Sequence, residues 1–172
     1  MWDPTGKYPV VSRDGVWKQV VLEDGHAQLN IASNVTAAAS NTAYALNYSV
    51  SGHADGISFG SPASRIIFSE AGHYWLAFTA QIKSSSSSDV EFYFWPRING
   101  VNNGGTSMRA SLHSNSSTIV VSRSALFQMS AGDYLEVMWA VTSTSGSLEA
   151  HAATAFAPSS PASTLAIMRV HA

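Results

Sequence analysis

Residues 125–139 decide the fold of this chain, and their sequence is Ala-Leu-Phe-Gln-Met-Ser-Ala-Gly-Asp-Tyr-Leu-Glu-Val-Met-Trp. Ala131-Gly132-Asp133 forms a tight polar turn between two apolar runs. After the turn, one alternating set is Leu135, Val137 and Trp139, and the other is Tyr134, Glu136 and Met138. This period of two is typical of a strand with one face in the core. Because large side chains occupy both faces, the pattern predicts an all-β module that associates with copies of itself.

The composition indicates a single domain with few charges. The chain has 172 residues and a formal net charge of −2, and 12% of its residues are charged, which is about half the usual share. A domain of this length can bury a sizeable core. The charge balance offers no basic surface, so we expect neither nucleic acid nor a membrane as a partner.

The cysteine count and the first residues bear on the compartment. The chain has no cysteine, which excludes disulfides and thiolate metal sites. The start of the chain, Met1 to Val11, lacks a cationic stretch followed by an apolar run. No stretch approaches the ~20 apolar residues of a membrane helix. We therefore expect the protein to be made and folded in a cytoplasm.

The first forty residues differ in pattern from the rest. Residues 16–22 and 27–31 flank an Asp24-Gly25 turn signal, which predicts a β-hairpin. A tract of small residues follows, from Ala32 to Thr42. The sequence therefore predicts an N-terminal arm over residues 1–41, carrying this hairpin, and a head domain over residues 42–172.

The head reads as a series of short strands separated by turn signals, with no convincing helical period. About ten strands at this spacing favour a sandwich or a barrel. The predicted strands are 43–50, 56–60, 65–69, 73–83, 90–98, 106–113, 117–129, 133–142, 147–157 and 163–170.

Several large side chains lie opposite the predicted core face of their strands. If Tyr74 and Phe92 point inward, the alternation turns Trp75, Tyr93 and Trp95 outward, as it does Tyr134 and Met138. Cover by the arm or by loops would explain these positions. An interface between copies is the alternative, because aromatic residues and Met are enriched at interfaces.

Three short motifs occur in order along the head: Gly72-His-Tyr-Trp-Leu-Ala-Phe78, Arg97-Ile-Asn-Gly100 and the run from Leu126 to Leu135. The first and third resemble the G-x-Y strand and the φ-F-x-L-x-x-G-D-x-L signature of the tumour necrosis factor-like jelly-roll family. That family includes the globular heads of complement-type proteins, and the second motif is similar to their R-x-N-G turn. The resemblance covers about residues 43–170.

The resemblance implies a ten-strand, two-sheet jelly roll that forms a homotrimer. Trp75 and Ala77 match positions that face the threefold axis, whereas the positions that match the core are Tyr74, Leu76, Phe127, Leu135 and Val137. This chain departs from the animal members in lacking collagen repeats and cysteines, which argues against a cytokine or complement role. Members with short N-terminal arms occur in bacterial viruses, as head decoration proteins, head fibres or tail tips.

Catalytic patterns are weak in this sequence. Gly56-Ile-Ser58-Phe-Gly60 matches the nucleophile-elbow string G-x-S-x-G, but that elbow needs a helix after the serine, and a strand-like run follows Arg65. The six histidines are scattered without metal-binding spacing. We therefore expect no enzymatic activity, no metal and no cofactor.

Two functions remain open. The first is a capsid decoration, cement or head-fibre protein of a virion, assembled in the host cytoplasm and bound to the major capsid protein or another virion protein through its arm. The second is a tail or fibre tip that binds a receptor or a host surface glycan. The predicted capsid-attachment residues are Trp2, Tyr8, Trp17, Val20 and Leu22, and the predicted trimer-interface residues are Trp75, Ala77, Tyr93, Trp95, Tyr134 and Met138.

Overall fold

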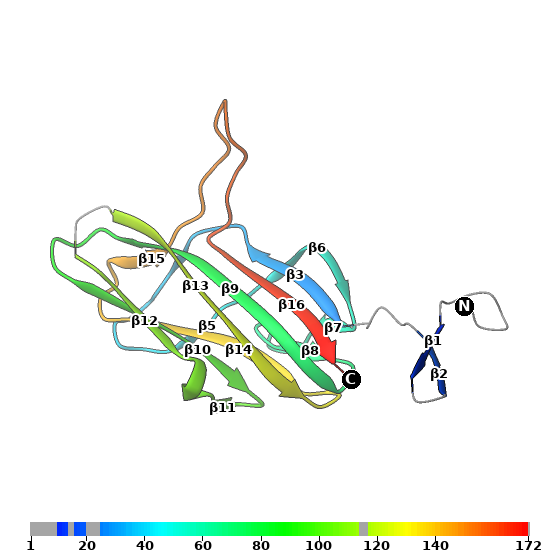
Figure 1. The fold of residues 1–172 in the computed structure, drawn as a ribbon. Coiled ribbons are helices and arrows are strands. Elements are labelled where there is room, and N and C mark those ends of the chain that lie inside the picture. Colours follow the sequence, from blue (N-terminus) through cyan, green and yellow to red (C-terminus); the bar gives the residue numbers. More distant parts are fainter. Residues whose placement is uncertain (1–9, 14–15, 20–24, 114–116, 172) are drawn as a thin grey trace.

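The chain folds into two antiparallel β-sheets that pack face to face as an open sandwich (Figure 1). This computed structural model describes residues 10–13, 16–19, 25–113 and 117–171. Each of the two sheets has seven strands. They exceed the ten predicted for the head because the predicted strand 43–50 is divided into β5 and β6, and because β3, β4 and β11 also join the sheets. The two-sheet, all-β architecture predicted from the sequence is confirmed.

The first sheet is built around β10, β14 and β8, with shorter strands at its edges. Its order is β11-β10-β14-β8-β7, while β12 pairs with β10 and β5 pairs with β14. The strand bounds are β5 Tyr44–Ala45, β7 Ile57–Phe59, β8 Ile66–Phe68, β10 Val90–Ile98, β11 Val101–Asn102, β12 Met108–Leu112 and β14 Tyr134–Val141. A single 3-10 turn, η1 (Gly104–Thr106), precedes β12.

The second sheet is built around the long strand β9. One edge of β9 pairs with β13 along its whole length, and the other edge pairs first with β16 and then with β15. Beyond β16 lie β3 and β6, and β15 pairs with β4. The bounds are β3 His26–Ile31, β4 Val35–Thr36, β6 Ser49–Asp55, β9 Gly72–Ser84, β13 Ser117–Met129, β15 Gly146–Leu148 and β16 Ser163–His171.

The predicted hairpin between residues 16–22 and 27–31 is wrong. Strand β2 (Val16–Gln19) pairs with β1 (Val10–Arg13), whereas β3 pairs with β16 and β6 of the second sheet. The reason lies in the alternation of β3, which buries Ala27, Leu29 and Ile31 in the sandwich. Burial in a large core outweighs the local turn signal at Asp24-Gly25. The strands of the sandwich therefore begin before the predicted boundary between residues 41 and 42.

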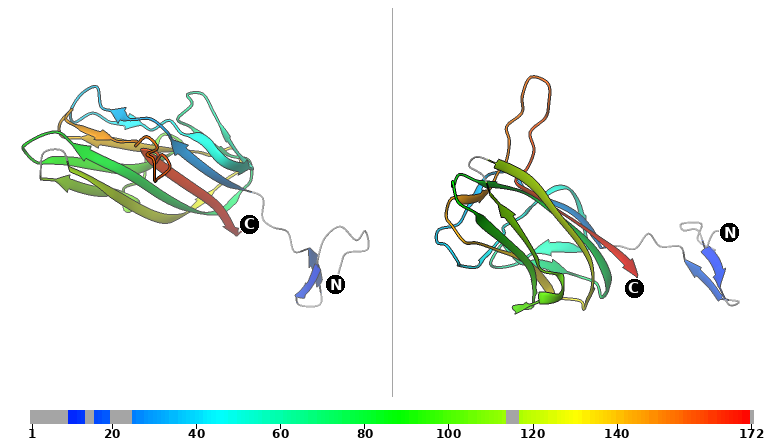
Figure 2. Two further views of the ribbon diagram at one scale, coloured as in Figure 1. Left: turned by 90° about the horizontal axis from the view of Figure 1, so that it is seen from above. Right: turned by 60° about the vertical axis from the view of Figure 1, so that its left-hand side comes forward.

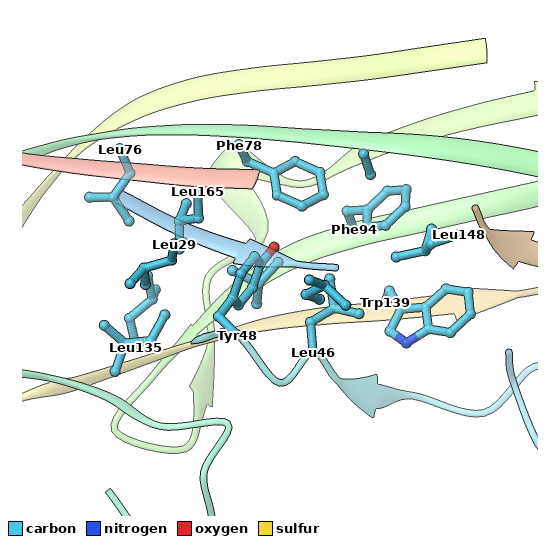
Figure 3. Close-up of a cluster of buried hydrophobic side chains, with 14 of the residues drawn as sticks. Leu29, Leu46, Tyr48, Leu76, Phe78, Phe94, Leu135, Trp139, Leu148 and Leu165 are labelled. Atoms are coloured by element: carbon cyan, nitrogen blue, oxygen red, sulfur yellow. The ribbon is translucent and has the colours of Figure 1, made fainter. Parts of the chain in front are cut away.

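The core lies between the two sheets and is made mainly by the inward-facing residues of the longer strands (Figure 3). The positions predicted as core from the resemblance, Tyr74, Leu76, Phe127, Leu135 and Val137, are all buried. Aromatic rings link the layers: the ring centroids of Phe78 and Phe94 are 5.1 Å apart. A core of this kind supplies most of the free energy of folding.

One buried polar contact ties the core to the backbone. The hydroxyl of Tyr48 lies 2.8 Å from the Ser163 hydroxyl, which in turn donates a 2.7 Å hydrogen bond to the carbonyl of Thr79. Tyr48 therefore acts as the donor to Ser163. Burial raises the pKa of Tyr48, so the phenol stays neutral.

The predicted strand over residues 147–157 is mostly absent. Strand β15 ends at Leu148, and the chain then projects from the sandwich before β16 begins at Ser163 (Figure 2). Residues 152–158 include Pro158 and four alanines but no residue that alternates into the core. A strand needs a packed face, and this segment offers none. We call residues 151–160 the finger.

Because β3 and β4 belong to the second sheet, the position of an N-terminal truncation should decide whether the shortened chain is stable. A chain that starts at Gly25 should unfold in one cooperative transition, because both seven-stranded sheets are complete. A chain that starts at residue 42 lacks β3 and β4 and loses the buried side chains of Ala27, Leu29, Ile31 and Ala37. Of these, Leu29 and Ile31 each contribute about 2–5 kcal/mol. That loss is comparable with the whole stability of a domain. Thermal unfolding by circular dichroism checks this, and equal midpoints for the two chains would contradict it.

Candidate self-association surface

The outer face of the second sheet carries a row of exposed large apolar side chains. Leu126 of β13, Trp75 of β9 and Met168 of β16 are direct cross-strand partners. Their exposed fractions are 62%, 38% and 54%. Neighbours of this kind on adjacent strands touch one another, so the three form one continuous apolar ridge. We call the outward residues of β13, β9 and β16 the β9 face.

Small residues form the next rows of the β9 face. Ser124, Ala77 and Ala166 are cross-strand partners, and the following row consists of Ser122, Thr79 and Thr164. The hydroxyls of Thr79 and Thr164 are hydrogen-bonded to each other. None of the nine residues in the three rows is charged. Beside the ridge, the β9 face therefore carries only small, uncharged side chains. Another protein surface could approach the backbone closely there.

The period of two explains how the chain makes this face. Phe127 and Tyr74 point into the core, so their neighbours Leu126 and Trp75 must point outward. Sequence analysis identified Trp75 and Ala77 but missed Leu126 and Met168. The alternation around Phe127 was sufficient to place Leu126 outward. The pairing of Met168 with Trp75 depends on the register between β16 and β9, which the sequence does not display.

The remaining predicted interface residues lie on the opposite side of the sandwich. Trp95 pairs with Met138 across β10 and β14, and Tyr93 lies on the same outer face of the first sheet. Tyr134 lies there too, with the Arg65 guanidinium 4.4 Å from its ring centroid. The structure therefore brings Trp75 and Ala77 together on one face, and Tyr93, Trp95 and Met138 together on the other. Tyr134 lies on that second face too, but pairs with Ile67 of β8, four residues along β14 from Met138. The structure does not combine the six into one patch.

Met138, Trp95 and Tyr93 on the first sheet are already buried or hydrogen-bonded within the chain. Met138 is only 4% exposed. The indole nitrogen of Trp95 donates to Asn102 Oδ1 at 2.9 Å. Tyr93 donates to the Glu91 carboxylate, which raises the pKa of the Tyr93 phenol, with desolvation as a smaller contribution. These side chains are buried or hydrogen-bonded within a single chain. The ridge of the β9 face, in contrast, leaves Leu126, Trp75 and Met168 exposed.

A buried carboxylate also stabilises the outer side of the first sheet. Glu136 is buried, and its Oε1 accepts a 2.7 Å hydrogen bond from the Ser64 hydroxyl. Its Oε2 accepts from Arg97 Nε at 2.9 Å. A buried charge needs such compensation. Because both carboxylate oxygens are engaged in holding the 61–65 loop to β10 and β14, we assign Glu136 a structural role.

The structure describes one of the five predicted attachment residues. Trp2, Tyr8, Val20 and Leu22 lie outside the described residues. Trp17 belongs to β2, which pairs with β1. Their role in capsid attachment stays a prediction from the sequence.

The catalytic and metal patterns find no support in the described geometry. Strand β7 leads from Ser58 into a turn and then into β8, not into a helix, so the strand-to-helix elbow is missing there. Among residues 25–113 and 117–171, no three His, Asp or Glu side chains gather closely enough to bind a metal ion. In the same ranges, no helix has the length and apolar character needed to span a bilayer.

Comparison with known proteins adds no family assignment. No protein-family model matches the chain, and no curated protein matches it.

Polar contacts hold the base of the finger to the second sheet. The Glu149 carboxylate is hydrogen-bonded to Lys83 Nζ and accepts from Thr118 Oγ1 at 3.0 Å. The Lys83 contact lowers the pKa of Glu149 below its ordinary value of 4.5, against a smaller opposing effect of desolvation. The backbone N–H of Ala150 also donates to Asn34 Oδ1 at 2.7 Å. The finger therefore leaves the sheet from a fixed point.

This lowered pKa predicts the pH dependence of one contribution to stability. Because the folded pKa of Glu149 lies below the unfolded value, its contribution is present above about pH 4.5 and is lost as the pH falls through the folded pKa. Glu149→Gln should lower the free energy of unfolding at pH 7 by at most about 1 kcal/mol, since solvent screens the pair. The difference from the parent chain should vanish in acid. Denaturant titrations at pH 7 and pH 3 measure it, and a difference that persists at pH 3 would contradict the assignment.

Proposed function

We propose that the chain is a non-enzymatic structural protein that forms a homotrimer through the β9 face and attaches to a larger assembly through its N-terminal segment. The assembly we propose is a virion, with the protein as a capsid decoration, cement or head-fibre protein. The observation that carries the proposal is the exposed ridge of Leu126, Trp75 and Met168.

The physics of the ridge favours association over solvent exposure. Burial of apolar surface contributes about 25 cal/mol per Å², and contiguous exposed apolar patches on sheets usually mark interaction sites. Trp and Met are also enriched at the centres of interfaces. The small residues Ala77, Ala166 and Ser124 beside the ridge would let a second backbone approach closely.

The course of the chain between the sheets supports the jelly-roll topology. Strands β8, β10, β12 and β14 belong to the first sheet, whereas β9, β13 and β16 belong to the second. The chain therefore crosses between the layers after β8, β9, β12, β13 and β14. Such crossing, with sheet orders of β12-β10-β14-β8 and β13-β9-β16-β3, suits two nested Greek keys. The number of copies, three, comes from the resemblance of the sequence motifs to the tumour necrosis factor-like family.

The attachment part of the proposal rests on the sequence of the N-terminal segment. Residues 1–24 contain two tryptophans and five valines, together with three positively and four negatively charged residues. Such a segment suits attachment by apolar burial and strand pairing. A trimer would present three of these segments, so avidity would strengthen a weak single contact.

A receptor- or glycan-binding tip is the second candidate. The loops at residues 85–88 and 99–105 are mostly exposed and rich in Ser, Asn and Gly. Hydroxyl and amide groups of this kind can hydrogen-bond to sugars. Nothing in their described contacts forms a concave site, so we rank this candidate below the decoration protein.

Trp75→Glu tests the trimer. The substitution would bring three like charges together on an apolar surface, and like charges placed together across an interface cost several kcal/mol. We expect the dissociation constant of the trimer to rise at least about a hundredfold. Val101→Glu is the matched control, because Val101 is 71% exposed on β11 of the other sheet. Analytical ultracentrifugation measures both variants, and a parent chain that is a stable monomer at micromolar concentration would overturn the proposal.

A salt extraction tests the mode of attachment. If apolar burial holds the protein on purified particles, it should remain bound in ~1 M NaCl, where charges are screened within about 3 Å. Trp17→Ala should weaken attachment, since a buried aromatic side chain contributes roughly 1.5–3 kcal/mol. Sedimentation of particles followed by quantification of the bound chain gives the result. Complete release by salt from particles that carry the parent chain would show that the contact is electrostatic.

A further inference from the structure

The outer face of the first sheet carries a hollow, on the side of the sandwich opposite the β9 face. It spans three neighbouring strands, β12, β10 and β14 (Figure 1). Its volume is about 530 Å³, and it is open to solvent. Ligand pockets have volumes of about 300–1,000 Å³, so the hollow can hold a small molecule. The residues that line it include Tyr93, Trp95, Ser107, Arg109 and Ala140.

The hollow results from a small residue placed beside large ones. Ala140 of β14 is the direct cross-strand partner of Tyr93, whose partner on the other side is Arg109 of β12. Tyr93 and Trp95 are two residues apart on β10, so both side chains point to the same outer face. Because the side chain of Ala140 is a single methyl group, space remains above β14 beside the two aromatic rings.

Contacts within the chain hold both rings by their polar edges. The Tyr93 hydroxyl donates to the Glu91 carboxylate, and the indole nitrogen of Trp95 donates to Asn102 Oδ1 at 2.9 Å. Both side chains are half-buried and line the hollow, so part of each ring stays available to a ligand. A side chain that is already held in place loses little entropy when a ligand packs on it.

An ion pair lies at the Tyr93 end of the hollow. Arg109 Nη2 is 3.2 Å from Glu91 Oε1, and the Arg109 side chain is 61% exposed. The pair presents a hydrogen-bond donor beside an acceptor and has no net charge. A hydroxyl group can donate to the carboxylate and accept from the guanidinium. An anion would be repelled by Glu91 and a cation by Arg109, so the hollow favours neutral hydroxyl groups.

The aromatic rings and the ion pair together define one class of ligand. A purely apolar molecule would cover the ion pair without hydrogen-bonding to it, which is unfavourable. A sugar ring has a face of C–H groups that packs on an aromatic ring, and hydroxyl groups around its edge. We propose that the hollow binds a pyranose ring, which packs on Trp95 and forms hydrogen bonds with Arg109 and Glu91.

This binding site goes beyond the proposed structural role and differs from the loops considered above for glycan binding. Its side chains belong to strands of the first sheet, so association through the β9 face of the second sheet leaves it open. Each copy in an oligomer contributes one site. Several sites together strengthen weak binding to a surface that carries many sugars.

Saturation-transfer NMR on the full chain tests the site. The probes are the methyl pyranosides of glucose, galactose, mannose and N-acetylglucosamine. We expect saturation of the ring protons of at least one probe, because the site recognises the ring and its hydroxyl groups. Sorbitol and cyclohexanol are the control compounds, since the first has hydroxyl groups without a ring and the second has a ring with a single hydroxyl group. Both should give weaker signals than the bound pyranoside.

Two substitutions test the position of the site in different ways. Trp95→Ala removes the aromatic ring, and Ala140→Leu fills the hollow without removing any group. Each should raise the dissociation constant of the bound pyranoside about tenfold or more. The matched controls are Trp75→Ala and Ala166→Leu on the β9 face, which should leave this constant unchanged. Thermal unfolding by circular dichroism shows which variants are folded, and either folded site variant decides the test.

The outcomes separate this site from the proposed function. Absence of ring-proton signals from all the pyranosides overturns the site, as does binding that survives Trp95→Ala or Ala140→Leu in a folded variant. A signal from sorbitol or cyclohexanol equal to that of the pyranosides also overturns it, because hydroxyl groups or a ring alone would then be sufficient. A monomeric parent chain that binds a pyranoside would overturn the trimer and leave this site standing.

Discussion

The alternation of side chains along β9 is the constraint on which the rest of the structure depends. Tyr74, Leu76, Phe78, Ala80 and Ile82 all point into the core. Because successive side chains of a strand point to opposite faces of the sheet, the residues between these core positions must point to the outer face. Trp75 and Ala77 are therefore turned to the outside by the same residues that fix the core. Since β9 pairs with β13, β15 and β16, its orientation also fixes the outward residues of those strands.

The two outer faces of the sandwich differ in how far contacts within the chain cover their large side chains. On the first sheet, Glu136 and Met138 are buried by the chain itself, and Arg97, Ser64 and Asn102 satisfy polar atoms there. On the second sheet, the ridge of Leu126, Trp75 and Met168 remains in solvent. This difference is the reason why we propose the β9 face as the surface for association, because exposed apolar area is unfavourable in water.

Polar contacts join the base of the finger to the second sheet. The Glu149 carboxylate is hydrogen-bonded to Lys83, and the backbone N–H of Ala150 donates to Asn34 Oδ1. Residues 151–156 beyond this base are exposed. These contacts therefore fix where the finger leaves the sheet.

The sequence by itself determined the features that depend on local pattern. The strands at 117–129 and 163–170, the turn at Ala131-Gly132-Asp133 and the inward set of β9 follow from alternation and turn chemistry, since both act over a few residues. It also placed Trp75 outward. Only the tertiary structure decided what depends on pairing between distant segments. The turn signal at Asp24-Gly25 favoured a hairpin, but burial of Leu29 and Ile31 against β16 recruited β3 to the sheet. The pairing of Met168 with Trp75, the unpaired edge at β12 and β13, and the projection of the finger likewise depend on register and on which strands become neighbours. These are properties of the whole core, because each is set by side chains far apart in the chain that must be buried together.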